Sequence, residues 1–413
     1  MRFHRVGTLR LLEILGEWSA GPGPLYRQLA EGLERSINQG DLRPGTILPS
    51  ERTLASALAV SRTTVAAALR EVKDAGYLDS APGSGTWVRR IRGFNPAGGV
   101  STPSGTVGRN PLFARLGAAS DGTVDLTAAV LDPSPLVAET VEEAGRRIRH
   151  TVTGSGYHPL GLAPLRQMIA GWFTRRGLPT LEEEILVTSG AQQGLMTIAA
   201  AYIQPGDPVV VESPTYPGFL EALRLVGASV RTVPVHTDGL RSEDVVAAVD
   251  ARSPNLVYFI PTFQNPTGTV MSGFDRRRLA RSLVDRGVVV VEDESLVELS
   301  LDGEPTPPPF GSFFESTLIV GSASKAFWGG LRIGWIRGSE ELIRRLSSYK
   351  TVFDLATSVP SQAAAALLLE RSEPILAERR GQLISRRGTL MDALDQHLPD
   401  WEWTRPEGGL SIW

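Results

Sequence analysis

The spacing of apolar residues differs between the two parts of the chain. Near the N-terminus, Leu25, Leu29, Leu33 and Ile37 recur at helical spacing, which predicts an amphipathic helix that ends at Gly40. Farther along, helical patterns alternate with short runs that are apolar at every position. Such runs are typical of strands covered by helices on both faces of a sheet. We therefore expect a small helical region followed by a larger α/β body.

Two more helices are predicted in the N-terminal region. Ser50 is a suitable N-cap for the first and Ser61 for the second, because a serine hydroxyl accepts hydrogen bonds from free amides in the first turn. Two short helices, a tight turn and a polar outer face are typical of a helix-turn-helix. In its second helix, Arg62, Thr63 and Thr64 can reach bases and phosphates. The alternative is a small helical domain whose polar face is only solvated. The apolar face of the second helix is made of Val65, Ala68, Leu69 and Val72.

A hairpin and a positive charge complete the N-terminal pattern. The sequence of residues 77–88 predicts two short strands around a glycine-rich turn, which would form a wing. Residues 1–92 carry a net charge of +4 and the remainder a net charge of −7. Only the front part of the chain is therefore suited to bind a polyanion.

The body shows the order of elements of a mostly parallel sheet. Because its strands are apolar throughout and alternate with helices, the sequence predicts α/β architecture. Ligands of such sheets bind at the carboxyl ends of the strands. The predicted helices are Pro164–Arg176 and Gln192–Tyr202, and the predicted strands are Ile185–Val187, Pro208–Glu212, Leu256–Ile260, Val288–Glu292, Leu318–Val320 and Ile333–Ile336.

Two strand ends carry polar groups that suggest a ligand. The turn Thr188–Gln192 leads from a strand directly into a helix, and the free amides of a helix N-terminus form an anion site suited to phosphate. Many such turns have no ligand, so this signal is weak alone. The run Val291–Glu294 places carboxylates at the end of an apolar strand. A buried carboxylate there needs a cationic or protonated partner.

The use of lysine points to a third strand end. Of 42 basic residues, only Lys73, Lys325 and Lys350 are lysine. Arginine cannot lose a proton and attack a carbonyl to form an imine, whereas lysine can. Lys325 follows an apolar strand close to Ser322 and Arg332, which fits a Schiff-base residue beside a phosphate site. The alternative is a lysine with a buried stem in a salt bridge. Lys73 and Lys350 lie in helical, charged contexts, and we expect both to be solvated.

Composition excludes several other classes of protein. The chain has no cysteine, which excludes disulfides, thiolate zinc sites and cysteine nucleophiles. Its five histidines lack the close spacing of a helical metal pair, so we expect no metal site. We find neither an apolar run long enough to span a bilayer nor a secretory leader. We therefore expect a cytoplasmic protein with no membrane partner.

A segment rich in glycine, proline, serine and threonine separates the two regions. It is too long for a loop within a compact domain, so we interpret it as a linker. Its latter part, with Leu112, Phe113 and Leu116, can alternatively form an ordered strap over the body. The expected parts are an N-terminal extension (1–22), a winged helix-turn-helix (23–90), a linker (91–122) and the body (123–413).

The motif LPSERTLASALAVSRTTV, followed by GSGTWV, resembles the winged helix-turn-helix of GntR-type transcription regulators. The resemblance covers residues 24–88 and includes both the helix pair and the wing. It implies that the protein binds double-stranded DNA, with the tip of the wing in the minor groove. The residues that the resemblance places at DNA are Ser50, Arg52, Ser61, Arg62, Thr63 and Thr64, with Gly83 and Gly85 at the wing tip.

The body, from about Leu126 onward, resembles the fold-type I aminotransferases, which bind pyridoxal 5′-phosphate. The motifs YHPLG, SPTYPG and NPTG carry the resemblance, together with Asp293 and Lys325. The resemblance implies that Lys325 forms an imine with the cofactor and that Asp293 keeps the pyridine nitrogen protonated. It also implies that Asn265 bonds the ring hydroxyl and that Tyr216 stacks on the ring.

The same resemblance implies a phosphate site. Its amides match Ala191 and Gln192, and Ser322 and Arg332 match the side chains that bind the phosphate. Tyr157 matches a tyrosine that reaches the phosphate of the neighbouring subunit, which implies a homodimer with sites at the subunit interface.

Two features depart from the aminotransferase pattern. Ser295 and Leu296 stand where the family has a tyrosine that bonds the ring hydroxyl, so Asn265 is expected to act there alone. The chain stops at residues 406–413, which resemble a strand within the small domain of the family. The small domain therefore looks incomplete, and the segment that in the family holds the arginine that grips a substrate carboxylate is missing. Either the chain is truncated or the protein lacks this clamp. Transaminase activity is doubtful on both counts.

A winged helix-turn-helix, a long linker and an aminotransferase-like body, in this order, resemble the MocR-type subfamily of GntR regulators. The resemblance implies a transcription regulator in which pyridoxal 5′-phosphate, or its adduct with an amino compound, binds at Lys325 and repositions the DNA readers. Two alternatives stay open. One is an active aminotransferase with an attached DNA-binding module, and the other is a degenerate body that serves only as a dimerisation scaffold without cofactor.

Overall fold

The computed structural model places two compact units along the chain, Met1–Gly105 and Thr106–Trp413. The expected linker, including Leu112, Phe113 and Leu116, lies outside the residues that the structure describes, and the expected domain boundaries stay predictions. The described residues are 4–16, 18–19, 23–38, 41–42, 45–74, 77–81, 85–88, 129–148 and 154–413.

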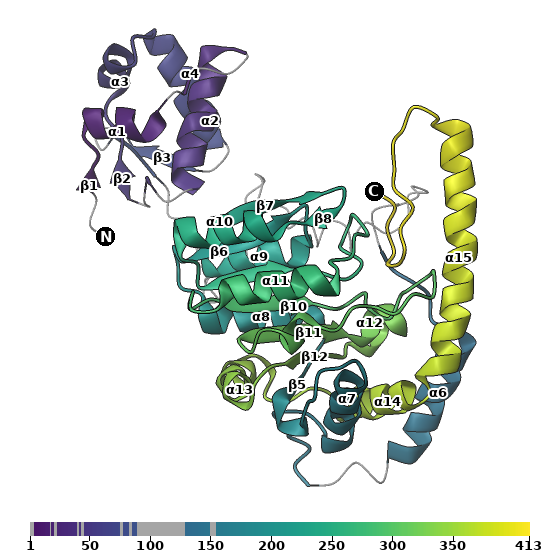
Figure 1. The fold of residues 1–413 in the computed structure, drawn as a ribbon. Coiled ribbons are helices and arrows are strands. Elements are labelled where there is room, and N and C mark those ends of the chain that lie inside the picture. The colour runs from purple at the N-terminus through teal and green to yellow at the C-terminus, as the bar shows by residue number, and fades with distance from the viewer. Residues whose placement is uncertain are drawn as a thin grey trace. The chain divides into compact units, whose positions relative to one another are not determined.

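The first unit combines four helices with a small sheet among its described residues (Figure 1). The sheet has the strand order β1-β2-β4-β3, with β1 and β2 parallel and the remaining pairs antiparallel. The helices are α1 (Thr8–Leu15), α2 (Leu25–Asn38), α3 (Glu51–Ala57) and α4 (Arg62–Asp74). The strands are β1 (His4–Arg5), β2 (Thr46–Ile47), β3 (Leu78–Ala81) and β4 (Gly85–Val88).

The predicted helix pair is confirmed, together with both of its N-caps. The Ser50 hydroxyl accepts a hydrogen bond from the Thr53 amide at 3.2 Å, and the Ser61 hydroxyl accepts one from the Thr64 amide at 3.0 Å. The predicted inner face of α4 is buried against α2 and α3. Strands β3 and β4 form the predicted hairpin, whose tip at residues 82–84, with Gly83, lies outside the described residues.

The second unit is built around an eight-stranded sheet of order β5-β12-β11-β10-β9-β6-β7-β8. Its centre, from β11 to β7, is parallel, whereas β12 runs against β5 and β11, and β8 runs against β7. The predicted, mostly parallel sheet is therefore confirmed. The strands are β5 (Ile185–Thr188), β6 (Pro208–Ser213), β7 (Ser229–His236), β8 (Gly239–Leu240), β9 (Leu256–Phe259), β10 (Val289–Asp293), β11 (Thr317–Ser322) and β12 (Gly334–Arg337).

Helices cover both faces of this sheet, which explains why its strands are apolar at successive positions (Figure 1). On β6, Val209 and Val211 pack towards α8, α9 and α13, whereas Val210 packs towards α10 and α11. Helices α7 and α14 cover the end of the sheet near β5. The helices are α6 (Pro135–Arg147), α7 (Ala163–Arg175), α8 (Ala191–Tyr202), α9 (Pro217–Val226), α10 (Ser242–Arg252), α11 (Gly273–Leu283), α12 (Ala323–Ala326), α13 (Glu340–Asp354), α14 (Val359–Glu370) and α15 (Ser372–His397).

None of the helices in the described ranges is long and apolar enough to cross a membrane. The long helix α15 lies along one side of the second unit (Figure 1).

At the N-terminus of α8, backbone segments approach closely. A Cβ atom added to Gly334 would lie 2.6 Å from the Ala191 amide nitrogen and 2.9 Å from the Gly321 carbonyl oxygen. The start of β12 therefore needs glycine so that the turn between β5 and α8 can sit against it.

Candidate functional site

Three consecutive carboxylates lie buried at the end of β10 and just beyond it. Because side chains alternate along a strand, Glu292 and Glu294 share one side of the sheet and Asp293 points to the other. Arg276 and Arg176 neutralise the two glutamates. The Arg276 Nη1 atom lies 3.4 Å from Glu292, and the Arg176 guanidinium donates two hydrogen bonds to Glu294, at 2.6 and 2.7 Å. The predicted need for cationic partners is met for these two groups.

Asp293 differs from its neighbours because its hydrogen-bond donors are uncharged. The Tyr258 hydroxyl donates to Oδ2 at 2.9 Å, and the Ser295 amide donates to Oδ1 at 2.9 Å. Among the described residues, no cation lies within ion-pair distance of Asp293. Burial raises the pKa of its carboxyl. A protonated nitrogen placed beside it would therefore be strongly favoured.

Lys325 lies in α12, directly after β11, which is the strand paired with β10. Its Nζ atom donates a hydrogen bond to the Ala129 carbonyl at 2.5 Å. Burial lowers the pKa of the Lys325 amine, and the Asp293 carboxylate opposes that shift. A lysine that is more easily deprotonated than usual is suited to nucleophilic attack on a carbonyl.

The turn between β5 and α8 has the conformation of an anion site. Gly190 adopts a φ of 94°, which favours glycine, and α8 begins at the next residue, Ala191. Arg332 donates a hydrogen bond to the Ser189 carbonyl at 3.1 Å, which fixes its guanidinium at the turn. A Cβ atom on residue 190 would lie 2.7 Å from the Arg332 Nη2 atom. The side chain of Gln192 donates to the Gly218 carbonyl at 2.8 Å.

Tyr216 is the N-cap residue of α9 and is half-buried. Burial raises the pKa of its phenol; Asp293 adds to the shift and Arg332 opposes it, so Tyr216 interacts electrostatically with both side chains. Asn265 is also half-buried. The preceding residue, Gln264, connects the turn that contains Asn265 to the turn that contains Tyr216. The Gln264 amide donates to the Glu212 carboxylate at 2.9 Å and to the Pro214 carbonyl at 2.8 Å.

The remaining predicted positions are less tightly placed. Ser322 caps α12 by accepting a hydrogen bond from the Ser324 amide at 3.1 Å. The Tyr157 side chain is 64% exposed, so it faces solvent rather than its own sheet. In the first unit, Ser50, Arg52, Ser61, Arg62 and Thr63 are exposed at the starts of α3 and α4, Thr64 is partly buried, and Gly85 begins β4.

Two features were not foreseen from the sequence. Tyr258 was overlooked, although a tyrosine within the apolar strand run LVYF is a signal that a polar group inside the sheet needs a donor. The expectation that Lys350 is solvated is wrong. Its side chain is fully buried, and its Nζ atom lies 2.7 Å from Asp354. Lys73 is exposed, as expected.

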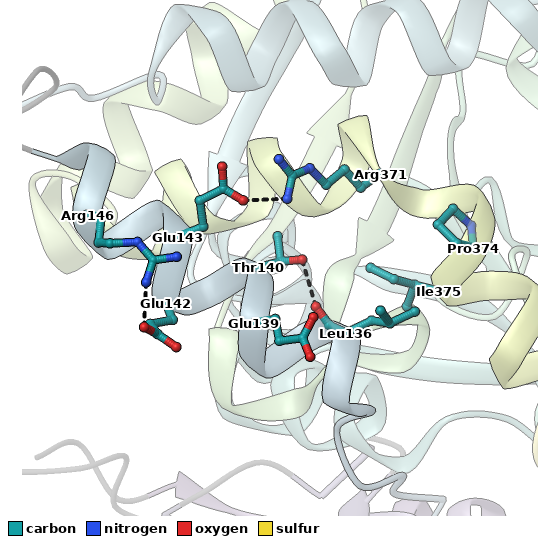
Figure 2. Close-up of a pocket in the computed structure, with 9 residues that line it drawn as sticks. All are labelled: Leu136, Glu139, Thr140, Glu142, Glu143, Arg146, Arg371, Pro374 and Ile375. Carbon is teal, nitrogen blue, oxygen red and sulfur yellow. Dashed lines mark hydrogen bonds and ion pairs between the residues drawn. The ribbon is translucent and has the colours of Figure 1, made fainter.

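A separate hollow of about 330 Å³ lies between α6 and the junction of α14 with α15 (Figure 2). Charged side chains around it already pair with one another, as Arg371 does with Glu143 and Arg146 with Glu142. None of the strand-end residues described above lines it. We therefore place the candidate site at the carboxyl ends of β10 and β11 and not in this hollow.

Comparison with known proteins identifies both units. Residues 121–413, more than half of the chain, match the family model for class I and II aminotransferases. The chain belongs to this aminotransferase family. Residues 25–88 match the model for bacterial regulatory proteins of the gntR family. The protein is therefore a GntR-type DNA-binding regulator fused to an aminotransferase-like domain, in the arrangement of MocR-type regulators.

Relatives of this MocR-type chain include both regulators and aminotransferases. It is 30% identical to the probable rhizopine catabolism regulatory protein MocR of Rhizobium meliloti, over 92% of this chain and 78% of that protein. It is 29% identical to the HTH-type transcriptional regulator YdfD of Bacillus subtilis, over 94% of this chain and 84% of that protein. The crystal structure of α-aminoadipate aminotransferase LysN from Thermus thermophilus matches with 32% identity and a TM-score of 0.62, over 68% and 74% of the two chains.

The cofactor that the aminotransferase family implies is pyridoxal 5′-phosphate. The groups present in the MocR-type chain fit this molecule. An amine with a lowered pKa lies in α12, directly after β11, and the neighbouring strand β10 ends in a buried carboxylate. Among the described residues, no cation lies within ion-pair distance of this carboxylate. The helix α8 begins directly after a glycine. The amine can react with an aldehyde, the carboxylate can bind a protonated ring nitrogen, and the helix N-terminus can bind a phosphate.

We predict that cofactor binding depends on pH through Asp293. The raised pKa of Asp293 means that its carboxylate is lost as the pH falls, and an uncharged carboxyl holds a protonated ring nitrogen less well. The Tyr258 hydrogen bond lowers this pKa, so Tyr258→Phe raises it. Binding of pyridoxal 5′-phosphate should therefore begin to weaken at a higher pH in Tyr258→Phe than in the wild type.

The measurement is the dissociation constant of pyridoxal 5′-phosphate as a function of pH, with the absorbance of the bound cofactor as the signal. Tyr26→Phe, in the first unit, is the matched control. We expect Tyr258→Phe to weaken binding near neutral pH by roughly tenfold, since a hydrogen bond to a charged group contributes about 1.5–3 kcal/mol. Superimposable pH profiles for the two variants would contradict this role of Tyr258.

Proposed function

We propose that this protein is a transcription regulator whose DNA binding responds to pyridoxal 5′-phosphate, or to an amino compound that reacts with it. The observation that carries the proposal is the buried Asp293 carboxylate, whose hydrogen-bond donors are uncharged and which has no cation within ion-pair distance among the described residues. It ends β10, and Lys325 lies directly after the neighbouring strand, β11. When bound, the cofactor supplies an aldehyde that reacts with primary amines and a ring that withdraws electrons.

In this proposal four side chains hold the ring of the cofactor. Lys325 binds the aldehyde carbon, and its lowered pKa supports that role. Asp293 keeps the ring nitrogen protonated and is itself oriented by Tyr258. Asn265 donates to the ring hydroxyl, and Tyr216 packs on the ring face. The electrostatic interaction between Tyr216 and Asp293 supports their assignment to one site.

The phosphate is assigned to the turn at the start of α8. The amides of Ala191 and Gln192, the Ser322 hydroxyl and the Arg332 guanidinium would bind it, because free helix amides and arginine both favour a dianion. Tyr157 is exposed on its own subunit, which is consistent with contact to the phosphate of a second subunit.

A homodimer is part of the same proposal. The end of α13 exposes an apolar patch, which we define as Tyr349, Val352, Phe353 and Leu355, and Val352 is 84% exposed. Large apolar side chains gathered on one helix face mark an association surface. A two-fold dimer presents two DNA readers to paired half-sites. Such a protein acts in the cytoplasm, where its DNA is.

DNA contact is assigned to residues at the starts of α3 and α4, namely the exposed Ser50, Arg52, Ser61, Arg62 and Thr63 and the partly buried Thr64. Gly83 and Gly85 of the wing are assigned to DNA with them. A bound cofactor would favour one conformation of the second unit over another, and the preferred conformation would set the spacing of the two readers. An assay of amino-group transfer between an amino acid and a keto acid separates this function from that of an active aminotransferase.

The proposal predicts that Lys325→Ala abolishes the yellow absorption band of the lysine-bound cofactor. It also predicts that DNA binding by Lys325→Ala no longer responds to pyridoxal 5′-phosphate, whereas wild-type binding to the DNA upstream of its own gene does. The matched control is Lys73→Ala, which removes an exposed lysine of the first unit. A wild-type protein without the band, or a Lys325→Ala variant that keeps it, would contradict the cofactor role.

A second prediction concerns the DNA readers. The double variant Arg62→Ala with Thr63→Ala should weaken specific DNA binding by about 1–3 kcal/mol for each base that the variant no longer reads, while the cofactor band stays unchanged. Arg252→Ala, an exposed arginine of the second unit, is the control. Both are measured by fluorescence anisotropy at one fixed salt concentration, because phosphate contacts depend steeply on salt. Unaltered specific binding in the double variant would refute the assignment.

A further inference from the structure

Lys350 is a buried lysine that donates a hydrogen bond to Asp354. It lies in α13, its side chain is fully buried, and its Nζ atom is 2.7 Å from the Oδ1 atom of Asp354. A buried charge is costly unless it is paired, and this pair is formed four residues apart on one helix. In a chain with only three lysines, this is the second one placed inside the aminotransferase-like unit.

The other oxygen of Asp354 reaches the turn between β5 and α8. Its Oδ2 atom accepts hydrogen bonds from the Gln193 amide at 2.8 Å and from the Ser189 hydroxyl at 3.2 Å. The Gln193 side chain in turn accepts a hydrogen bond from the Ser189 backbone amide at 2.6 Å. Asp354 therefore holds the two residues that flank Gly190, Ala191 and Gln192, the segment assigned to the phosphate.

Asp354 brings a negative charge towards an anion site, and Lys350 offsets that charge. An unpaired carboxylate at this place would repel a phosphate dianion, because like charges repel and the partly buried Asp354 is only partly screened by water. The hydrogen-bond acceptor of Asp354 and its charge thus have separate effects. The acceptor oxygen fixes the turn between β5 and α8, and the Lys350 ammonium offsets the repulsion between the Asp354 carboxylate and a phosphate bound at this turn.

We propose that Asp354 and Lys350 are positioning residues for the phosphate-binding turn, with Asp354 orienting Ser189 and Gln193 and Lys350 neutralising Asp354. The inference rests on the proposed function, in which the turn at the start of α8 binds the phosphate of pyridoxal 5′-phosphate. Neither residue touches the cofactor. Their substitution should therefore change the preference for a phosphate group and leave the reaction of Lys325 with an aldehyde intact.

The test compares pyridoxal 5′-phosphate with pyridoxal, which has the same aldehyde but no phosphate. The dissociation constants of both are measured on the full chain from the absorption band of the lysine-bound form. The phosphate preference is the dissociation constant of pyridoxal divided by that of pyridoxal 5′-phosphate. Lys350→Met should lower this ratio by roughly tenfold or more, since it leaves a carboxylate unpaired. The affinity for pyridoxal should stay within about twofold, as in a protein whose fold is intact.

Two double variants separate charge from position, and neither contains an unpaired charge. In K350M/D354N the asparagine oxygen can still accept from Ser189 and Gln193, so the phosphate preference should return to within about threefold of the wild type. In K350M/D354A the acceptor is gone, so the preference should fall by roughly tenfold. These variants keep the test decisive if Lys350→Met alone does not fold.

The matched control is E340Q/R344M, which removes an exposed ion pair of the same spacing on the same helix. It should leave the ratio unchanged. Equal phosphate preferences in K350M/D354N and K350M/D354A would overturn the positioning role, as would a Lys350→Met variant that weakens both compounds equally. Absence of the band with either compound in the wild type would overturn the proposed function, and this inference with it. A wild-type band with unaltered ratios in all variants would overturn this inference alone.

Discussion

The site depends on one constraint, a buried carboxylate that has no cation within ion-pair distance among the described residues. The sheet brings three carboxylates to the end of β10, and alternation along the strand separates Asp293 from Glu292 and Glu294. Arginines neutralise the two glutamates, whereas Asp293 has a tyrosine hydroxyl and a backbone amide. A ligand that carries a proton on nitrogen would complete a site of this kind. The Lys325 amine, whose pKa is lowered by burial, lies in α12, directly after the neighbouring strand.

Local features of the chain were sufficient to predict the elements that carry the site. Apolar strands followed by glycine or serine turns gave the sheet, and Ser50 and Ser61 gave the starts of two helices, because capping depends on residues within a single turn. Lys325 could be singled out because its chemistry differs from that of the arginines that dominate the composition. These inferences need only neighbours in sequence or general composition.

Pairings between distant residues could not be predicted in the same way. Tyr258 is 35 residues from Asp293, Arg176 is 118 residues from Glu294, and Gln193 is 161 residues from Asp354. Each pair depends on strand order and on how helices cover the sheet, which hydrophobic spacing does not define. Lys350 shows the limit most clearly. Its helical, charged context predicted a solvated side chain, but packing of α13 against α8 and β5 buries it.

The central claim is that cofactor binding in the second unit and DNA binding by the first are coupled, and thermodynamic linkage offers a direct test. If the cofactor changes the affinity for DNA, DNA must change the affinity for the cofactor by the same factor. The measurement is the dissociation constant of pyridoxal 5′-phosphate for the full chain, with and without saturating DNA from upstream of its own gene. The account predicts constants that differ by about 5- to 150-fold, the usual range of such coupling. Equal constants with DNA bound and unbound would contradict it.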